Sequence, residues 1–343
     1  MKFFSRKADF TISKNGMNVI ETIQIGGIKQ SILIQTEDIK NPMLFVLHGG
    51  PSMPIPGISN RGADYTLITC TKRLVKHFTL VYWDQRGTGK SYSKDIPKET
   101  MHLKQFIRDA KEITDYLLKR FKQPKLHIMA YSWGTIIGLP LISQYPDLFY
   151  SYTALSQVTN WGENDKLSYR WLLKKAKETN NQKAINELTR IGEPPYLKSF
   201  KKWNILQKWL FKYKSMIYDA KDKGTPTYFK MFQMMLTSPD YTLKDIYHSL
   251  ITGMKLAYSE QMLYDLNHFN FPIEIPKVEI PVLFIHGKKD KHIMPKLIQD
   301  YFEKLDAPEK RLYWAKKSSH IFHLDDAKEI EQILIDNLRE WSE

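Results

Sequence analysis

The sequence predicts an α/β fold with a mostly parallel, doubly wound sheet into which one long helical segment is inserted. Three observations support this fold class. Short, continuous apolar runs of the buried-strand type alternate with stretches of helical periodicity. Glycine-bearing turns follow several of these runs, at the strand ends where such sheets place their functional sites. The alternation stops near residue 159 and resumes at residue 281, which indicates a separate helical unit between these points.

The first part of the chain provides a hairpin and two buried strands. Residues 19–36 alternate between apolar and polar on both sides of Gly26-Gly27, which predicts a β-hairpin with a glycine turn. The continuous apolar runs 43–47 and 79–83 predict two strands that are buried on both faces. In the turn after the second run we expect Asp84 and Arg86 to pair and to fix its shape.

Two helices and further strands follow. Apolar residues recur at helical spacing from Leu103 to Phe121, which predicts an amphipathic helix. A strand at 126–129 precedes a second helix over 135–145, in which Pro140 should kink the axis because it removes a backbone hydrogen bond. Residues 152–156 predict the next strand.

Residues 159–264 contain no convincing buried strand and are rich in aromatic residues and methionine. They predict a helical lid inserted into a core domain that comprises residues 1–158 and 265–343. Most of the lid aromatics are expected to form the core of the lid itself, and some to line a pocket over the sheet.

The strand and helix alternation then completes the core domain. A last helix is expected to begin at Asp326, where Glu329 completes an N-cap pattern. The other elements expected in this region are strands at 281–287 and 311–315 and a helix near 295–305.

Ser132 stands at the apex of the turn between the strand at 126–129 and the helix that follows. The sequence Ala-Tyr-Ser-Trp-Gly (130–134) matches the small-x-Ser-x-Gly nucleophile elbow, a strained turn that exposes the serine hydroxyl. The turn also points the serine at a helix N-terminus, where free N–H groups favour a developing negative charge. The alternative is a serine that only caps the helix.

A serine nucleophile needs a base to accept its proton and an acid to orient that base. Asp290 and His320 each follow a later predicted strand, so the chain provides Ser, Asp and His in the order of the α/β-hydrolase fold. We therefore expect Ser132 as nucleophile, His320 as base and Asp290 as orienting acid. Asp290 as a simple helix cap is the alternative at that position, and His323 competes with His320 because both follow the last strand.

The oxyanion hole requires two backbone N–H donors, one from the residue after the nucleophile and one from the loop after an earlier strand. Trp133 provides the first. In the turn at 48–52, glycines let the backbone approach a substrate carbonyl, and we prefer Gly50 to Gly49 as the second donor. His48 is expected to be structural.

Three motifs together resemble the proline iminopeptidase family of α/β hydrolases: His48-Gly49-Gly50-Pro51, Asp-Gln-Arg-Gly-Thr-Gly-Lys-Ser at 84–91, and Ser132-Trp133-Gly134. The resemblance covers the whole chain. It implies a cofactor-free serine hydrolase and, in many members, removal of an N-terminal residue, often proline, from peptides. Ser52 and Ala130 stand where the family usually has glycine.

Aminopeptidase members of this family are expected to hold the free amine of the substrate with lid carboxylates. Glu163 is accordingly our expected substrate-binding residue in the lid, together with Gly49 in the glycine turn. Asp165 and Glu193 are alternatives, and surface solvation explains all three carboxylates equally well. Residues 156–264 carry 18 Lys and Arg against 10 Asp and Glu, an excess that gives no long-range attraction to a cationic substrate.

The composition argues against several classes of protein. The net charge of +14 is accompanied by no helix-turn-helix, finger or RNA-binding signature, so we expect no nucleic-acid partner. No apolar run approaches the roughly 18 residues of a membrane span, and residues 1–9 lack the apolar block of a signal peptide. We therefore expect a cytoplasmic protein without stable membrane insertion.

Cys70 is the only cysteine, and the ten histidines show no spacing such as H-E-x-x-H, so neither an intrachain disulfide nor a metal site is expected. The absence of any other cofactor is what the family resemblance implies.

The expected function is that of a serine hydrolase that acts through an acyl-enzyme, with a small molecule or short peptide as substrate. Within this class we favour an aminopeptidase of the prolyl type. The first alternative is a carboxylester or lactone hydrolase of a small acyl compound, which a lid pocket without a buried carboxylate would favour. The second is a non-catalytic ligand-binding protein with the same fold.

Overall fold

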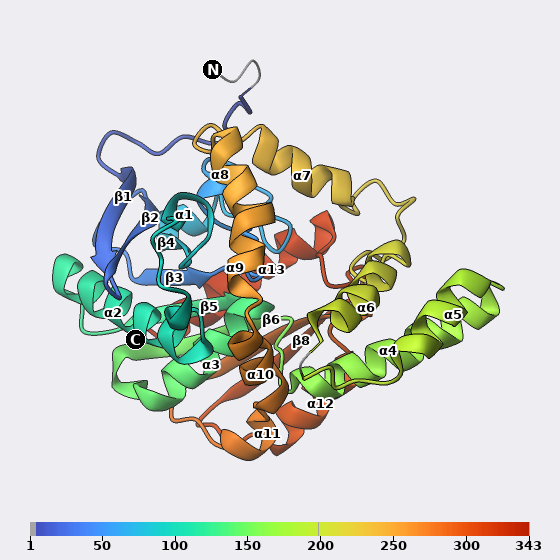
Figure 1. The fold of residues 1–343 in the computed structure, drawn as a ribbon. Coiled ribbons are helices and arrows are strands. Elements are labelled where there is room, and N and C mark those ends of the chain that lie inside the picture. The colour runs from blue at the N-terminus through green and yellow to red at the C-terminus, as the bar shows by residue number, and fades with distance from the viewer. Residues whose placement is uncertain (1–4, 198, 343) are drawn as a thin grey trace.

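The structure, a computed structural model, describes residues 5–197 and 199–342. An eight-stranded sheet forms its centre (Figure 1). The strands lie in the order β1-β2-β4-β3-β5-β6-β7-β8, and β2 pairs antiparallel with β1 and β4, whereas all other neighbours are parallel. The predicted fold class and the N-terminal hairpin are thus confirmed. The strands are β1 (Met17–Ile25), β2 (Ile28–Thr36), β3 (Met43–Leu47), β4 (Thr79–Asp84), β5 (Leu126–Tyr131), β6 (Phe149–Leu155), β7 (Val282–Gly287) and β8 (Lys310–Ala315).

Helices cover both faces of the sheet. Because side chains alternate across a strand, Phe45 and Val81 pack in one apolar core, and their neighbours Leu44 and Leu80 pack in a second core on the other face. The first core includes α2 (Leu103–Phe121), α3 (Trp133–Gln144) and α12 (Pro295–Lys304); the second includes α1 (Leu74–His77) and α13 (Leu324–Glu340). Burial on both faces explains why β3 and β4 are continuous apolar runs in the sequence.

Between β6 and β7 the chain forms a helical insertion, residues 156–281, which lies on one side of the sheet (Figure 1). Its described residues contain no strand, as the sequence predicted. The division into a core and a lid domain at residues 159 and 264 stays a prediction. The helical segments of the insertion are α4 (Trp161–Glu178), α5 (Gln182–Ile191), α6 (Phe200–Lys212), α7 (Tyr228–Leu236), α8 (Leu243–Tyr247), a π-helical turn (His248–Gly253), α9 (Met254–Ala257), α10 (Glu260–His268) and α11 (Phe271–Glu274).

None of the helices in the described ranges combines the length and the apolar character that crossing a membrane requires.

The predicted start of the last helix is wrong. Helix α13 begins at Leu324 and not at Asp326. Its N-cap is His323, whose imidazole Nδ1 accepts a hydrogen bond from the backbone N–H of Asp325 at 3.0 Å. Asp326 instead accepts hydrogen bonds from the preceding loop, so its carboxylate fixes that loop and does not cap the helix.

The predicted pairing of Asp84 with Arg86 is also wrong. Arg86 forms a buried, two-pronged ion pair with Asp109 of α2, at 2.8 and 3.0 Å. Asp84 accepts hydrogen bonds from the hydroxyl of Tyr241 in the insertion and from the backbone N–H of Lys90. The turn after β4 is therefore fixed by partners that are remote in the sequence, and Asp84 connects the sheet to the insertion.

Candidate active site

Ser132 lies between the end of β5 and the start of α3, at the apex of the predicted turn. Its φ of +49° and ψ of −113° are a strained combination for a residue with a side chain. The enclosure around the turn holds it in this shape. A Cβ atom at Gly134 would lie 2.3 Å from the carbonyl oxygen of Leu47 and 2.8 Å from that of His48, so only glycine fits there.

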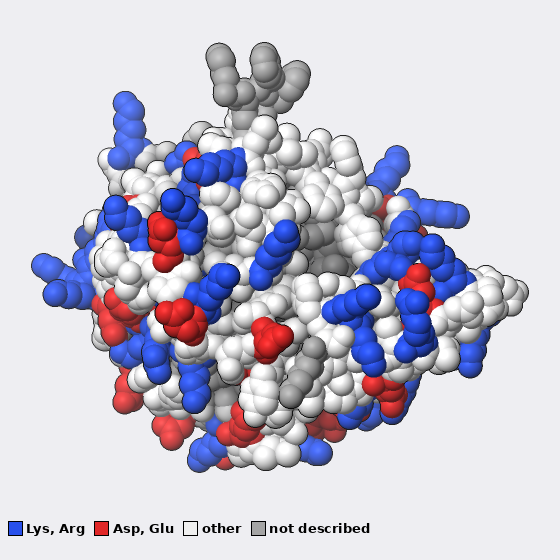
Figure 2. Space-filling view, in the orientation of Figure 1, with Lys and Arg blue, Asp and Glu red and all other residues white. Residues whose placement is uncertain are grey.

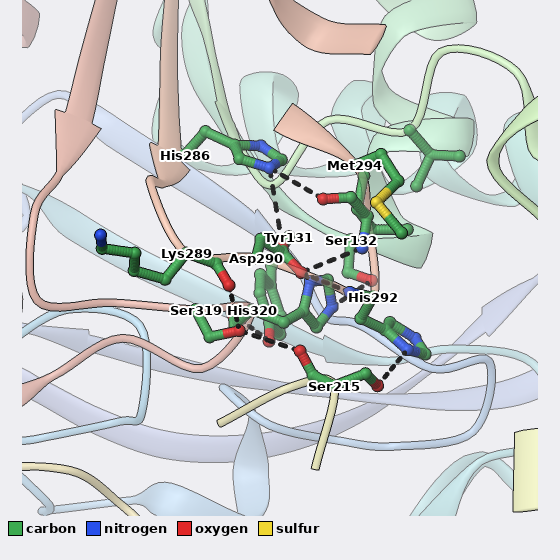
Figure 3. A network of polar contacts seen from close by, with 12 residues as sticks. Tyr131, Ser132, Ser215, His286, Lys289, Asp290, His292, Met294, Ser319 and His320 are labelled. Carbon is green, nitrogen blue, oxygen red and sulfur yellow. Dashed lines mark hydrogen bonds and ion pairs between the residues drawn. The ribbon is translucent and has the colours of Figure 1, made fainter. Parts of the chain in front are cut away.

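The structure brings Ser132, His320 and Asp290 together from three separate strand ends (Figure 3). The Nδ1–H group of His320 donates to Asp290 Oδ2 at 2.9 Å, and Nε2 of the same ring accepts from Ser132 Oγ at 2.9 Å. Burial acts to raise the pKa of Asp290, but the charge and hydrogen bond of His320 outweigh it and hold that pKa below its usual value. Asp290 is therefore ionised and able to orient the imidazole.

A second layer of contacts fixes these groups. The other carboxylate oxygen of Asp290 accepts the backbone N–H groups of His292 at 2.7 Å and Ile293 at 3.0 Å. The hydroxyl of Tyr131 donates to the backbone carbonyl of His320 at 3.0 Å, and the two rings lie 5.3 Å apart (Figure 3). The imidazole therefore has little freedom to turn away from Ser132.

The competing histidine, His323, is directed elsewhere. Its Nε2 atom lies 3.0 Å from Asp222 Oδ1, and its Nδ1 atom caps α13. Between the two candidates, the structure thus places His320 and not His323 against the serine.

The glycine turn after β3 lies beside Ser132. Gly50 has a φ of +135°, and a Cβ atom there would lie 2.6 Å from the backbone nitrogen of Ser52, so the turn requires glycine. His48 supports this turn: its Nδ1–H donates to the carbonyl of Gly49 at 2.6 Å, and its Nε2 accepts the backbone N–H of Gln85. Burial lowers the pKa of His48 to about 4, so the ring is neutral and structural, as expected.

Gln85 connects the two segments that carry the expected oxyanion donors. Its side-chain N–H donates to the carbonyl of His48 at 3.1 Å, and its side-chain oxygen accepts the indole N–H of Trp133 at 2.9 Å. Sequence reasoning gave Gln85 no role. Its position directly after β4, between the glycine turn and the elbow, was the available signal.

Two cavities meet at Ser132. The larger has a volume of about 290 Å³, lies between the sheet and the insertion, and is lined by both Gly49 and Gly50. The smaller, of about 40 Å³, is lined by Gly50 and by residues of α4 and α6. On the face shown in Figure 2, the surface is hollowed where α6, α7 and α9 meet; uncharged residues border the hollow, and Lys and Arg side chains lie further out on both sides.

Glu163, the expected amine anchor, lines neither cavity, contrary to the position that this expectation requires. Its carboxylate pairs with Lys166 at 3.2 Å on the outer side of α4. Glu193 likewise pairs with Arg170 at the surface. Asp165, which sequence reasoning held only as an alternative, is 4% exposed and lines the small cavity.

The surroundings of Asp165 are aromatic. Burial raises its pKa to about 7, and the indole N–H groups of Trp161 and Trp203 oppose that rise, although neither makes a hydrogen bond of normal geometry. No described Lys, Arg or His side chain forms an ion pair with it. Asp165 is the only acidic or basic (Asp, Glu, Lys, Arg) side chain among the described residues that line the two cavities.

A family model described as alpha/beta hydrolase fold matches residues 42–327. The chain belongs to this family. A relative from Bacillus subtilis (strain 168), named probable aminopeptidase YbaC, is 32% identical over 314 residues, which are 91% of this chain and 94% of the relative. The serine hydrolase BPHL of Homo sapiens is 36% identical over 91 residues, which are 26% of this chain and 27% of that protein.

Solved structures show the same fold. A proline iminopeptidase of Mycobacterium smegmatis superposes with a TM-score of 0.61 at 17% identity, over 94% of this chain and 98% of that one. VinJ superposes with a TM-score of 0.61 at 14% identity, over 94% and 99% of the two chains. Together with the Bacillus relative, these matches confirm the predicted resemblance to proline iminopeptidase-like α/β hydrolases. The protein is a hydrolase of this fold.

In this α/β hydrolase, one histidine beside the serine was not anticipated. His292 lines both cavities, and its ring centre lies 4.8 Å from that of His320. Burial lowers its pKa to about 3, so it is neutral at physiological pH. Asn164 of α4 donates to the backbone carbonyl of His292 at 2.9 Å and accepts the N–H of Met294, so the insertion braces the loop that carries Asp290.

In the described part of this hydrolase, no group of three or more His, Cys, Asp or Glu side chains is arranged to hold a metal ion.

Proposed function

We propose that this protein is a serine aminopeptidase that removes a small N-terminal residue, of the proline type, from short peptides. Ser132 Oγ attacks the scissile carbonyl carbon as His320 Nε2 takes its proton, and Asp290 stabilises the resulting imidazolium. The backbone N–H groups of Trp133 and Gly50 hold the oxyanion. The proton then passes from His320 to the leaving amine nitrogen as the C–N bond breaks. Water, deprotonated by the same histidine, hydrolyses the acyl-enzyme and restores the serine.

The observation that carries the peptidase assignment is the carboxylate of Asp165 in the small cavity beside Ser132. A buried carboxylate without a cationic partner is unfavourable, and the ammonium group of a substrate would compensate its charge. Trp161, Trp203 and Tyr258 line the same cavity, and aromatic faces also attract an ammonium group. The excess of Lys and Arg in the insertion gives a cationic substrate no long-range attraction. Direct contact of the ammonium group with Asp165 and the aromatic rings does not depend on that overall charge.

The comparisons support the same assignment. The Bacillus relative, which matches nearly the whole chain, is named a probable aminopeptidase.

The test compares four chromogenic substrates: the prolyl amide and the alanyl amide with free amines, the N-blocked prolyl amide, and a short-chain ester. Ser132→Ala provides the blank. The proposal expects cleavage of the free-amine amides, a large loss on N-blocking, and a parallel loss in Asp165→Asn. Glu163→Gln, two residues away on the outer side of α4, is the matched control and should retain wild-type rates.

Ester cleavage without amide cleavage would refute the peptidase and support the carboxylester hydrolase. The observation that favours this second candidate is the size and apolar lining of the larger cavity. If the protein hydrolyses none of the substrates and does not react with a fluorophosphonate, a non-catalytic ligand-binding protein remains as the third candidate function.

A further inference from the structure

The two cavities impose a direction on any substrate that reaches Ser132. Gly50, Trp203 and His292 line both cavities, as does Ser132 itself, so the serine stands at their junction. A carbonyl carbon attacked there carries two substituents, the acyl side chain with its amine and the leaving group. Since the small and large cavities extend from the same point, each takes one of the two.

The position of His320 decides which cavity receives the leaving group. After attack, His320 Nε2 must donate its proton to the departing atom, so this atom has to lie beside the imidazole. His320 lines the large cavity and is not among the residues that line the small one. The leaving group therefore enters the large cavity, and the acyl residue with its amine enters the small cavity next to Asp165.

The large cavity is mainly apolar. We call it the methionine chamber, because five methionines line it together with aromatic and aliphatic side chains. Asn204, Gln207 and the two histidines also line it, but no Asp, Glu, Lys or Arg does among the described residues. Methionine adapts to ligands of different shapes. A charged group brought into such a chamber would lose much of its hydration without gaining an oppositely charged partner. The methionines are Met53, Met216, Met231, Met235 and Met254.

We propose that the methionine chamber selects peptides whose second residue is large and apolar and is not followed directly by a free carboxylate. This inference rests on the proposed aminopeptidase function and adds to it the specificity on the leaving-group side. The small cavity, with about 40 Å³ against about 290 Å³, restricts the first residue to a small side chain such as alanine or proline.

The test measures kcat/KM for prolyl dipeptide amides in which the second residue is glycine, leucine, phenylalanine or glutamate, and for prolyl-leucine with a free carboxylate. The leucine and phenylalanine amides are expected to exceed the glycine amide by about 10-fold or more, since each buried methylene contributes to discrimination. The glutamate amide and the free acid should be the poorest substrates.

Two variants on α7 separate the chamber from a general effect on the helix. Met231→Gln replaces a chamber residue at nearly constant volume and should reduce the ratio of leucine-amide to glycine-amide cleavage. Phe229→Gln alters a side chain on the same helix that is 72% exposed and does not line the chamber, so this ratio should stay at the wild-type value.

The outcomes distinguish this inference from the proposed function. Cleavage of all prolyl amides at equal rates would refute the chamber assignment and leave the aminopeptidase intact. A change in the preference for the first residue in Met231→Gln, with the second-residue preference unchanged, would show the opposite substrate direction and overturn the inference. If no free-amine peptide is cleaved, the proposed function and the inference fail together.

Discussion

The substitution Asp165→Asn should make the protein more stable and less active. Burial raises the pKa of Asp165 from 3.8 to about 7, so the folded state holds a proton that the unfolded chain has released. The protonated carboxyl contributes stability that is fully present below pH 3.8 and is lost as the pH rises through about 7. Asparagine does not ionise and is free of this loss.

The magnitude follows from the change in pKa. A pKa raised from 3.8 to about 7 corresponds to about 4 kcal/mol of folding free energy lost at pH values well above 7. Part of this loss has already occurred at pH 5. The stability advantage of Asp165→Asn over the wild type should therefore grow by about 2–3 kcal/mol between pH 5 and pH 8.5.

Urea unfolding followed by tryptophan fluorescence at these two pH values measures the effect. On prolyl amides, the same variant should lose roughly 100-fold in kcat/KM, because the substrate ammonium would lack its buried partner. Glu163→Gln removes an exposed ion pair and should change stability by no more than about 1 kcal/mol at either pH. A variant that is less stable than the wild type at pH 8.5, with full activity, would refute the reasoning and make Asp165 a structural residue.

Three further predictions concern the elbow, the acid and the sheet. Asp290→Asn should keep the fold but lower kcat by on the order of 10⁴, since the amide favours the wrong imidazole tautomer. Steady-state kinetics measure the loss of kcat, and an unchanged circular dichroism spectrum shows that the fold is retained. A loss of kcat below tenfold would contradict the prediction. Gly134→Ala forces a Cβ to 2.3 Å from the carbonyl of Leu47 and should abolish reaction of Ser132 with a fluorophosphonate, so normal labelling would count against the enclosed elbow. Arg86→Met leaves the Asp109 carboxylate buried without its cation and should lower the free energy of unfolding, measured with urea, by about 3–5 kcal/mol. The double variant Arg86→Met/Asp109→Leu should recover part of this loss. No recovery would show that the two side chains act separately.

The sequence was sufficient to place Ser132, Asp290 and His320, because each follows a continuous apolar run and parallel strands end at one edge of the sheet. It could not identify the partner of Arg86. Asp109 lies within a long helix, and only the packing of α2 on the sheet brings the two together.

The sequence contains a signal that separates the positions of Glu163 and Asp165, of which only Asp165 lines a cavity. Residues two apart on a helix project about 200° from each other, so the two carboxylates face opposite sides of α4. Asp165 shares its face with Ser168, Leu172 and Ala176, which are all buried, and this spacing marks the inner side. Helical periodicity applied to the acidic residues would have selected Asp165.

The pairing of β6 with β7 joins segments that the whole insertion separates in the chain. Asp290 and His320 both follow β7, whereas Ser132 and both glycines of the turn precede the insertion. During synthesis, the serine elbow therefore leaves the ribosome long before the groups that would activate it. A nascent chain that ends within the insertion carries Ser132 without His320, the proposed base, so under the proposed mechanism hydrolytic activity should arise only after the segment that carries His320 has been translated and folded.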